Sequence, residues 1–186
     1  MDSVKKFFLR IWYWILAFLG QTPTTVTHNI PDLRQVKPGL WRSGQPQNVF
    51  DWEYLKSLGI NRAIKLNFES EYSDSAAQVA GITSYVMSVQ PEGDKDVISN
   101  ITNTFVRPDA KTIAEAEALI DPSVGTLVHC THGQDRTGYL IGRHRVNSEG
   151  WSKDDAYLEM LKFGFHPELH GLHEAWEEFT PTVKTS

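Results

Sequence analysis

Residues 128–138 read Val-His-Cys-Thr-His-Gly-Gln-Asp-Arg-Thr-Gly and contain Cys130, the single cysteine among the 186 residues of the chain. An apolar, strand-like run at residues 126–128 leads into this stretch, and a helix-compatible run follows it. A strand, a short loop and a helix N-terminus together form an anion site, because the first backbone N–H groups of a helix have no partner within the helix. The sequence therefore predicts a strand–loop–helix unit that binds an anion beside Cys130.

Two side chains near Cys130 suit chemistry on such an anion. The helix dipole and the guanidinium of Arg136 both favour the thiolate form of a nearby cysteine, which is its nucleophilic form. Arg136 also presents a planar fork that can hold two phosphate oxygens. Thr137 places a hydroxyl beside the sulfur, where it can help the thiolate leave in a second step. A buried structural cysteine is the alternative interpretation, and the Gly, Arg and Thr spacing around Cys130 disfavours it.

The motif Cys-x5-Arg-Thr-Gly, preceded by Val-His, resembles the signature loop of the cysteine-dependent protein tyrosine and dual-specificity phosphatases. Residues 39–46 resemble the opening of small bacterial dual-specificity-like phosphatases, and residues 150–167 resemble their C-terminal helices. The resemblance thus covers roughly residues 30–180. It implies attack of the Cys130 thiolate on a phosphomonoester and a phosphocysteine that water hydrolyses, with no metal or other cofactor.

The resemblance also assigns a role to each position of the loop. Cys130 is the nucleophile, Arg136 neutralises the phosphoryl oxygens, and Thr137 assists the second step. His129 holds the loop and tunes the thiol, a role that is compatible with a satisfied core histidine at the end of a strand. The other phosphate-binding positions are Thr131, His132, Gly133, Gln134 and Gly138.

The general acid that protonates the leaving group is usually an Asp in this family, and four candidates remain open. Asp135 lies inside the loop, and its Gly-x-Asp-Arg setting resembles myotubularin-type phosphatases, in which the in-loop Asp can be the acid; an ion pair that orients Arg136 is the alternative. Asp96 and Asp94 lie 34 and 36 residues before Cys130 in a polar stretch, which fits the family spacing. Asp109 ranks last, because a helix N-cap explains it equally well.

Composition places the chain among ordinary globular proteins of one domain, with 22% charged and 40% hydrophobic residues. The net charge of −5 gives no reason to expect a nucleic-acid partner, although the His-Cys-Thr-His-Gly run also resembles the loop of RNA 5′-triphosphatases. With one cysteine there is no internal disulfide, and a thiol-relay enzyme that needs a second cysteine is excluded.

Strand and helix patterns alternate along the chain and predict an α/β fold, with a central, mostly parallel sheet flanked by helices. The Cys-x5-Arg loop lies between a strand and a helix N-terminus in this fold. Strands are expected at residues 36–43, 60–66, 82–89 and 126–128, and helices at residues 49–58, 73–80, 110–120, 137–149, 152–162 and 168–179. Residues 90–108 read as a polar, mobile loop.

Residues 1–27 are expected to be an N-terminal hydrophobic anchor or signal-like segment with a linker, and residues 28–186 the phosphatase domain. Residues 7–20 form an apolar run after Lys5 and Lys6, which is shorter than the ~20 residues that cross a bilayer. Its Trp12 and Trp14 suit a membrane interface. We therefore expect membrane association through residues 7–20 in a bacterial protein, with the side of the membrane open. A core or partner-docking helix is the alternative.

Three further groups of polar residues allow two interpretations each. His166, His170 and His173 recur at nearly helical spacing, but Pro167 interrupts them, so we expect polar histidines on a C-terminal helix rather than a metal site. The others are candidate anion contacts or, alternatively, a strand edge, a turn and a solvated rim: Arg42, Ser43 and Gln45, and also Arg62 and Lys65.

The favoured function is therefore a metal-independent phosphatase of phosphotyrosine, phosphoserine or phosphothreonine in proteins. A phosphoinositide or inositol phosphate substrate is the first alternative, which the membrane-directed segment and the Gly-Gln-Asp-Arg run support. A non-catalytic phosphate-binding module is the second, and a membrane-anchored scaffold the third. Intact Cys130 and Arg136 weigh against the binding module, because a pure binder has no use for a reactive thiolate. The criteria for an active site favour the enzyme over both the module and the scaffold.

Overall fold

The computed structural model describes residues 28–67, 73–87, 89 and 107–182. It contains a five-stranded sheet in the order β1-β2-β5-β3-β4. The strands are β1 (Arg34–Lys37), β2 (Leu40–Ser43), β3 (Arg62–Lys65), β4 (Thr83–Val86) and β5 (Thr126–His129). β1 pairs antiparallel with β2, whereas β2, β5, β3 and β4 run parallel. The carboxyl ends of the four parallel strands therefore meet at one edge of the sheet.

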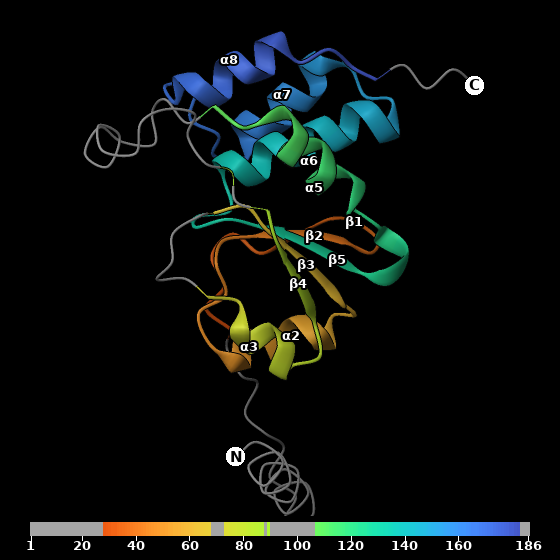
Figure 1. Cartoon of the computed structure of the whole chain (residues 1–186), viewed down its shortest axis with the longest axis vertical. Helices are drawn as coiled ribbons and strands as arrows, with labels where there is room; N and C mark the ends of the chain where they lie inside the picture. Colours follow the sequence, from red (N-terminus) through yellow and green to blue (C-terminus); the bar gives the residue numbers. More distant parts are fainter. Residues whose placement is uncertain (1–27, 68–72, 88, 90–106, 183–186) are drawn as a thin grey trace, which may run out of the picture.

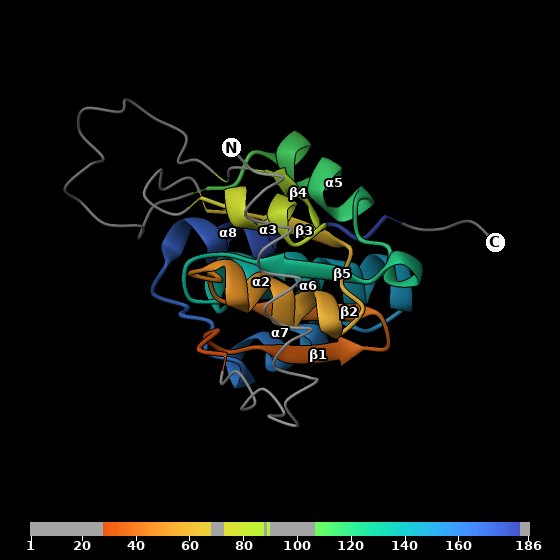
Figure 2. The same cartoon turned by 90° about the horizontal axis from the view of Figure 1, so that it is seen from below.

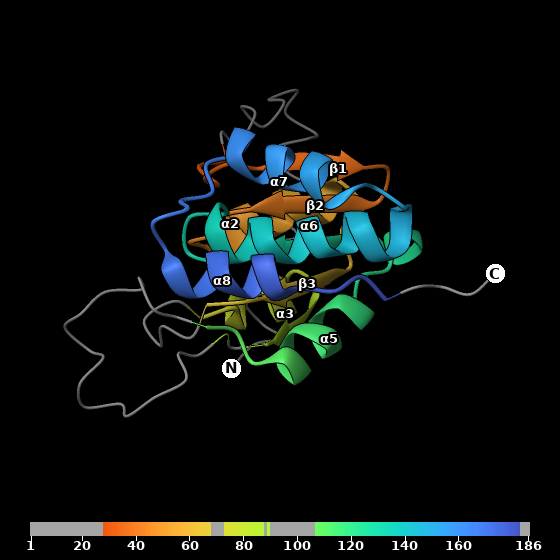
Figure 3. The same cartoon turned by 90° about the horizontal axis from the view of Figure 1, so that it is seen from above.

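Helices cover both faces of the sheet (Figure 1). One face carries α2 (Val49–Ser57) and α3 (Ser75–Val79), which Figure 2 shows from their own side. The other face carries α5 (Ala110–Ala118), α6 (Asp135–Glu149), α7 (Lys153–Lys162) and α8 (His170–Glu178). Figure 3 shows α6 across the middle of this face, with α7 toward β1 and α5 on the opposite side.

Alternating side chains of the central strands fill two cores, one on each face of the sheet. In β5, Val128 packs on the α6 side, whereas Leu127 packs on the side of α2 and α3. All four residues of β5 are buried, as expected for a parallel strand covered on both faces. Cys130 thus follows directly after the central, fully buried strand of the sheet. The predicted α/β fold with a mostly parallel sheet is confirmed.

The predicted elements agree with the observed ones except at their ends and in one hairpin. Residues 36–43 were expected to be one strand, but β1 and β2 form a hairpin around Pro38 and Gly39. Gly39 has a φ of +77°, and a Cβ there would lie 1.9 Å from the carbonyl oxygen of Pro122, so only glycine fits at this turn. α6 begins at Asp135, two residues before the predicted start at residue 137, and so takes Asp135 and Arg136 into its first turn.

Residues 7–20 and most of the polar loop at residues 90–108 lie outside the described residues, so the predictions made for them stay predictions. Within the described ranges, no helix is long and apolar enough to span a membrane.

Candidate active site

Cys130 lies directly after β5, at the sheet edge where the parallel strands end. Its side chain is 4% exposed, and its Sγ accepts a hydrogen bond from the backbone N–H of Gly133 at 3.3 Å. The loop then turns into α6, where the N–H of Gly138 donates to the carbonyl of Gln134 at 2.7 Å. The predicted strand–loop–helix unit is therefore present, with the sulfur close to backbone donors at a helix N-terminus.

The first turn of α6 places the two other predicted catalytic side chains inside the protein. Arg136 is 6% exposed and Thr137 is fully buried. The Oγ1 atoms of Thr137 and of Thr131 are buried and have no hydrogen-bond partner in the described part of the chain. These hydroxyls are therefore available to a group bound in the loop. The side chain of His132, by contrast, is exposed.

Arg42 in β2 and Gln45 just after it hydrogen-bond to the backbone of the loop. The backbone N–H of Gln45 donates to the carbonyl of Thr131 at 3.1 Å. The guanidinium of Arg42, which is 2% exposed, donates to the carbonyls of Gly133 at 2.8 Å and Gln134 at 3.4 Å. The strand-edge interpretation was wrong for Arg42 and Ser43, because β2 pairs with β1 on one side and with β5 on the other. The interpretation as anion contacts stays a prediction.

Gly133 is required by this close approach of β2. Its φ is +80°, and a Cβ there would lie 2.4 Å from the carbonyl carbon of Ser43 and 2.5 Å from the N of Gly44. Both contacts are with backbone, which cannot rotate away. Any side chain at this position must therefore push the loop off β2 and away from Cys130, whose Sγ the Gly133 N–H contacts.

We expect Gly133→Ala to weaken the binding of inorganic phosphate by about tenfold or more, because a shift of roughly 1 Å misplaces the loop donors. Gly150→Ala is the matched control. Gly150 also has a positive φ, +74°, but a Cβ there meets nothing within 4 Å. Titration calorimetry on both variants should show the loss only for Gly133→Ala, and equal affinities would contradict this account of the loop.

His129, the residue before Cys130, is fully buried and forms an ion pair with Asp74, with Nε2 and Oδ2 3.0 Å apart. Asp74 also accepts hydrogen bonds from Gln45 Nε2 at 2.8 Å and from Ser84 Oγ. Burial alone would raise the pKa of Asp74, but the hydrogen bond and charge of His129 and the bonds from Ser84 and Gln45 outweigh it and lower the pKa to about 2. Asp74 is therefore a carboxylate that only accepts, so His129 carries a proton on Nε2.

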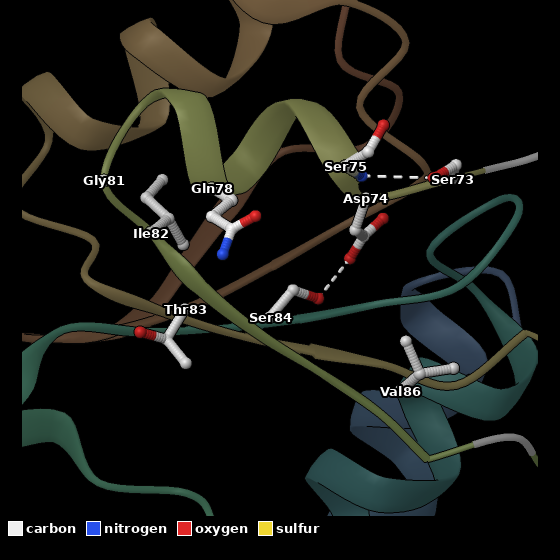
Figure 4. Close-up of a pocket in the computed structure, with 9 residues that line it drawn as sticks. All are labelled: Ser73, Asp74, Ser75, Gln78, Gly81, Ile82, Thr83, Ser84 and Val86. Carbon is white, nitrogen blue, oxygen red and sulfur yellow. Dashed lines mark hydrogen bonds between the residues drawn. The ribbon is translucent and has the colours of Figure 1, made fainter.

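Asp74 was not identified from the sequence. It precedes α3 at the N-cap position, but its side chain makes no cap hydrogen bond because its oxygens are taken by His129, Ser84 and Gln45. A cavity of about 480 Å³ lies beside it, and Figure 4 shows the Ser84–Asp74 hydrogen bond among its lining residues. The lining comes from α3, β4 and the turns that flank α3 and includes no residue of the Cys130 loop, so this cavity is distinct from the anion site.

The general-acid candidates have different positions. Asp135, in the first turn of α6, forms an ion pair with His166. The suggested ion pair with Arg136 stays a prediction. Asp94 and Asp96 lie outside the described residues. Asp109 caps α5 by accepting from the backbone N–H and the hydroxyl of Thr112, and these bonds lower its pKa. The predicted cap is therefore confirmed, and the lowered pKa makes Asp109 less suited to retain a proton for the leaving group.

The remaining polar candidates have structural partners. Gln134 donates to Asp32, and Arg62 donates to the carbonyl of Leu119. Lys65 is 5% exposed, so the solvated-rim interpretation was wrong for it. His173 stacks on the ring of Tyr157.

Comparisons with known proteins agree on the class of site. A family model described as "Tyrosine phosphatase family" matches residues 23–142. Dual specificity protein phosphatase TpbA from Pseudomonas aeruginosa strain UCBPP-PA14 is 43% identical over 137 residues, which are 74% of this chain and 56% of the relative. The protein of the same name from a second strain of that species is 26% identical over 137 residues. The chain thus spans little more than half the length of these curated relatives.

Solved structures share the fold. P. aeruginosa TpbA in complex with pTyr is 18% identical with a TM-score of 0.56, and the match covers 83% of this chain and 92% of that one. The core catalytic domain of the PP-IP phosphatase SIW14 from S. cerevisiae, in complex with citrate, is 22% identical with a TM-score of 0.58, covering 77% and 84%. At these identities the likeness concerns the fold alone.

Proposed function

Because the chain belongs to the tyrosine phosphatase family, we propose that it is a cysteine-dependent phosphatase that hydrolyses phosphomonoesters. The observation that carries the proposal is the position of Cys130, whose Sγ lies 3.3 Å from the N–H of Gly133 at the N-terminus of α6. Backbone donors and a helix dipole around a cysteine favour the thiolate, and they also bind a phosphoryl group.

The reaction follows from this arrangement in two steps. The Cys130 thiolate attacks phosphorus while the bond to the leaving oxygen breaks, and a phosphocysteine remains. The loop N–H groups and Arg136 neutralise the phosphoryl oxygens in the transition state. A water molecule then attacks phosphorus, and the hydroxyl of Thr137 donates to the departing sulfur. The Oγ1 atom of Thr137, which is buried and has no hydrogen-bond partner among the described residues, supports this role.

Phosphorylated proteins are the substrate class that we propose first. Support comes from the dual-specificity phosphatase among the relatives and from the TpbA structure with pTyr. Inositol phosphates or phosphoinositides are the second candidate, which the fold shared with a PP-IP phosphatase favours.

The proposal is tested by phosphate release from an aryl phosphate by the full chain, with and without a chelator. Chelator-insensitive release and a phosphocysteine trapped at Cys130 by rapid acid quench are expected. Phosphotyrosine, phosphoserine and phosphothreonine peptides are then compared with an inositol polyphosphate and a phosphoinositide to assign the substrate class. Tight binding of inorganic phosphate with no turnover of any of these would instead identify a phosphate-binding module.

We also propose that residues 7–20 attach the chain to a membrane, as their apolar composition and Trp12 and Trp14 indicate. The full chain should float with anionic lipid vesicles. The double variant Ile11→Glu and Ile15→Glu should not, because each charge costs about 2–4 kcal/mol in hydrocarbon. Thr24→Glu with Val26→Glu, beyond the apolar run, is the control and should still float. Flotation of the Ile11/Ile15 variant would contradict the proposal.

A further inference from the structure

The loop between α7 and α8 is hydrogen-bonded to the first turn of α6 at one carboxylate oxygen, Oδ1 of Asp135. Asp135 Oδ1 accepts from the backbone N–H of His166 at 2.9 Å and lies 2.9 Å from Nδ1 of the His166 ring. The Asp135 side chain is 18% exposed and the His166 side chain 48%. The loop residue next to Arg136 is therefore tied to a histidine that solvent can reach.

This geometry determines where the proton of the pair lies. An ionised carboxylate oxygen only accepts hydrogen bonds, so the ring nitrogen 2.9 Å from Oδ1 is the donor and Nδ1 carries hydrogen. The hydrogen bond and the charge of Asp135 raise the pKa of His166. Slight burial opposes this rise, and the charge of Glu168 adds a smaller one. These two carboxylates are the charged groups that act on His166 in the described part of the chain. The raised pKa of His166 thus extends to higher pH the range over which the pair holds this proton.

We propose that His166 is a positioning residue that keeps Asp135 supplied with the proton for the leaving group. The inference rests on the proposed phosphatase activity and deepens it. As Cys130 Sγ bonds to phosphorus, the electron pair of the breaking P–O bond stays on the leaving oxygen. The N–H bond at Nδ1 of His166 breaks as its proton moves to the Asp135 carboxylate, and the carboxyl group gives this one proton to the leaving oxygen. Asp135 is then a carboxylate again, beside a neutral His166. In the second step, attacking water bonds to phosphorus, the S–P bond breaks, and the proton released by water returns to the pair.

A general acid is most effective when its pKa lies near the working pH, and a histidine partner supplies a group of that kind. A carboxyl group without such a partner is ionised near neutral pH, whereas the contact with His166 places one transferable proton beside the Asp135 carboxyl group. The pair also explains why an acid inside the loop can serve both steps without moving, since the backbone N–H of His166 anchors it.

The test uses His166→Asn in the full chain, which keeps the backbone N–H and an amide donor but cannot store a proton. Turnover of a phosphoserine peptide, whose alkoxide leaving group needs a proton, should fall by about 10- to 100-fold. Turnover of an aryl phosphate with an acidic phenol should change by less than about threefold, because that phenolate leaves unaided. The basic limb of the kcat profile for the peptide should move to lower pH. The control, His173→Asn, alters a histidine that stacks on Tyr157 and should leave the profile unchanged.

Equal losses on the two substrates, or an unmoved basic limb, would overturn the proposal and leave His166 a purely structural role. Titration of the His166 ring by NMR in the wild type gives a second readout that does not depend on the variant's folding. The ring should titrate above its ordinary value of 6.5 and return toward it in Asp135→Asn, and a wild-type value at or below 6.5 would equally overturn the proposal. Failure of the proposed function itself would look different, since the wild type would then turn over no aryl phosphate.

Discussion

Cys130→Ser is expected to lose turnover of an aryl phosphate by about 10⁴-fold or more, because a serine hydroxyl is not ionised at neutral pH and the nucleophile of the first step disappears. The fold should survive. The side chain is small, and a serine Oγ can accept the same Gly133 N–H that Sγ accepts. The melting temperature should therefore stay within about 4 °C of the wild type, which corresponds to roughly 1 kcal/mol for a chain of this size. Phosphate release and a thermal melt on the same preparation make the comparison.

Arg136→Lys is the companion to this variant. It keeps the positive charge inside the loop but replaces a two-pronged donor with a single ammonium, so turnover should fall by about 10²- to 10³-fold. Cys130→Ser should still bind inorganic phosphate, whereas Arg136→Lys should bind it more weakly. If Cys130→Ser kept more than about a tenth of the wild-type turnover, thiolate catalysis would be refuted whatever the behaviour of Arg136→Lys.

The parts of the site that could be predicted are those in which neighbours along the chain make the chemistry. Cys130, Gly133 and Arg136 lie within seven residues, so their spacing carries the signal of the loop, and the family that this spacing indicated is the family of the chain. The helix caps at Asp109 and Ser152 were predictable for the same reason, because each cap bonds a residue three positions on.

The parts that could not be predicted join distant elements. Arg42 binds a carbonyl 91 positions away, and nothing in the sequence of β2 reveals that partner. His166 was considered as a metal ligand because of its spacing from His170, whereas its partner in the fold is Asp135, 31 positions away. A residue just before a helix is normally interpreted as a helix cap. The position of Asp74 therefore gave no indication that its carboxylate binds His129.

Among the substitutions considered, Asp74→Ala should lower the stability of the fold most, because it leaves three hydrogen-bond donors without their acceptor. His129 is fully buried and Gln45 is 1% exposed, and both lose the carboxylate that satisfies them, as does the hydroxyl of Ser84. Leaving a buried charged network without its acceptor costs about 3–5 kcal/mol, or roughly 6–20 °C in melting temperature for this chain length. Asp154→Ala, at an exposed position in the first turn of α7, is the control and should melt within about 2 °C of the wild type.

The stability that Asp74 contributes should also disappear in acid, and the sign follows from its pKa. The pKa of Asp74 is about 2 in the folded chain against an ordinary value of 3.8, so the unfolded chain takes up this proton at the higher pH. Stability from this group is therefore complete above about pH 5, and it is lost as the pH falls through 3.8 and then through 2. The shift is worth about 2 kcal/mol. Urea unfolding of wild type and Asp74→Ala between pH 2 and pH 7 should show a difference that shrinks by about that amount on acidification. If the difference in unfolding free energy stayed constant or grew as the pH fell, the ionised carboxylate of Asp74 would not be the group that stabilises buried His129.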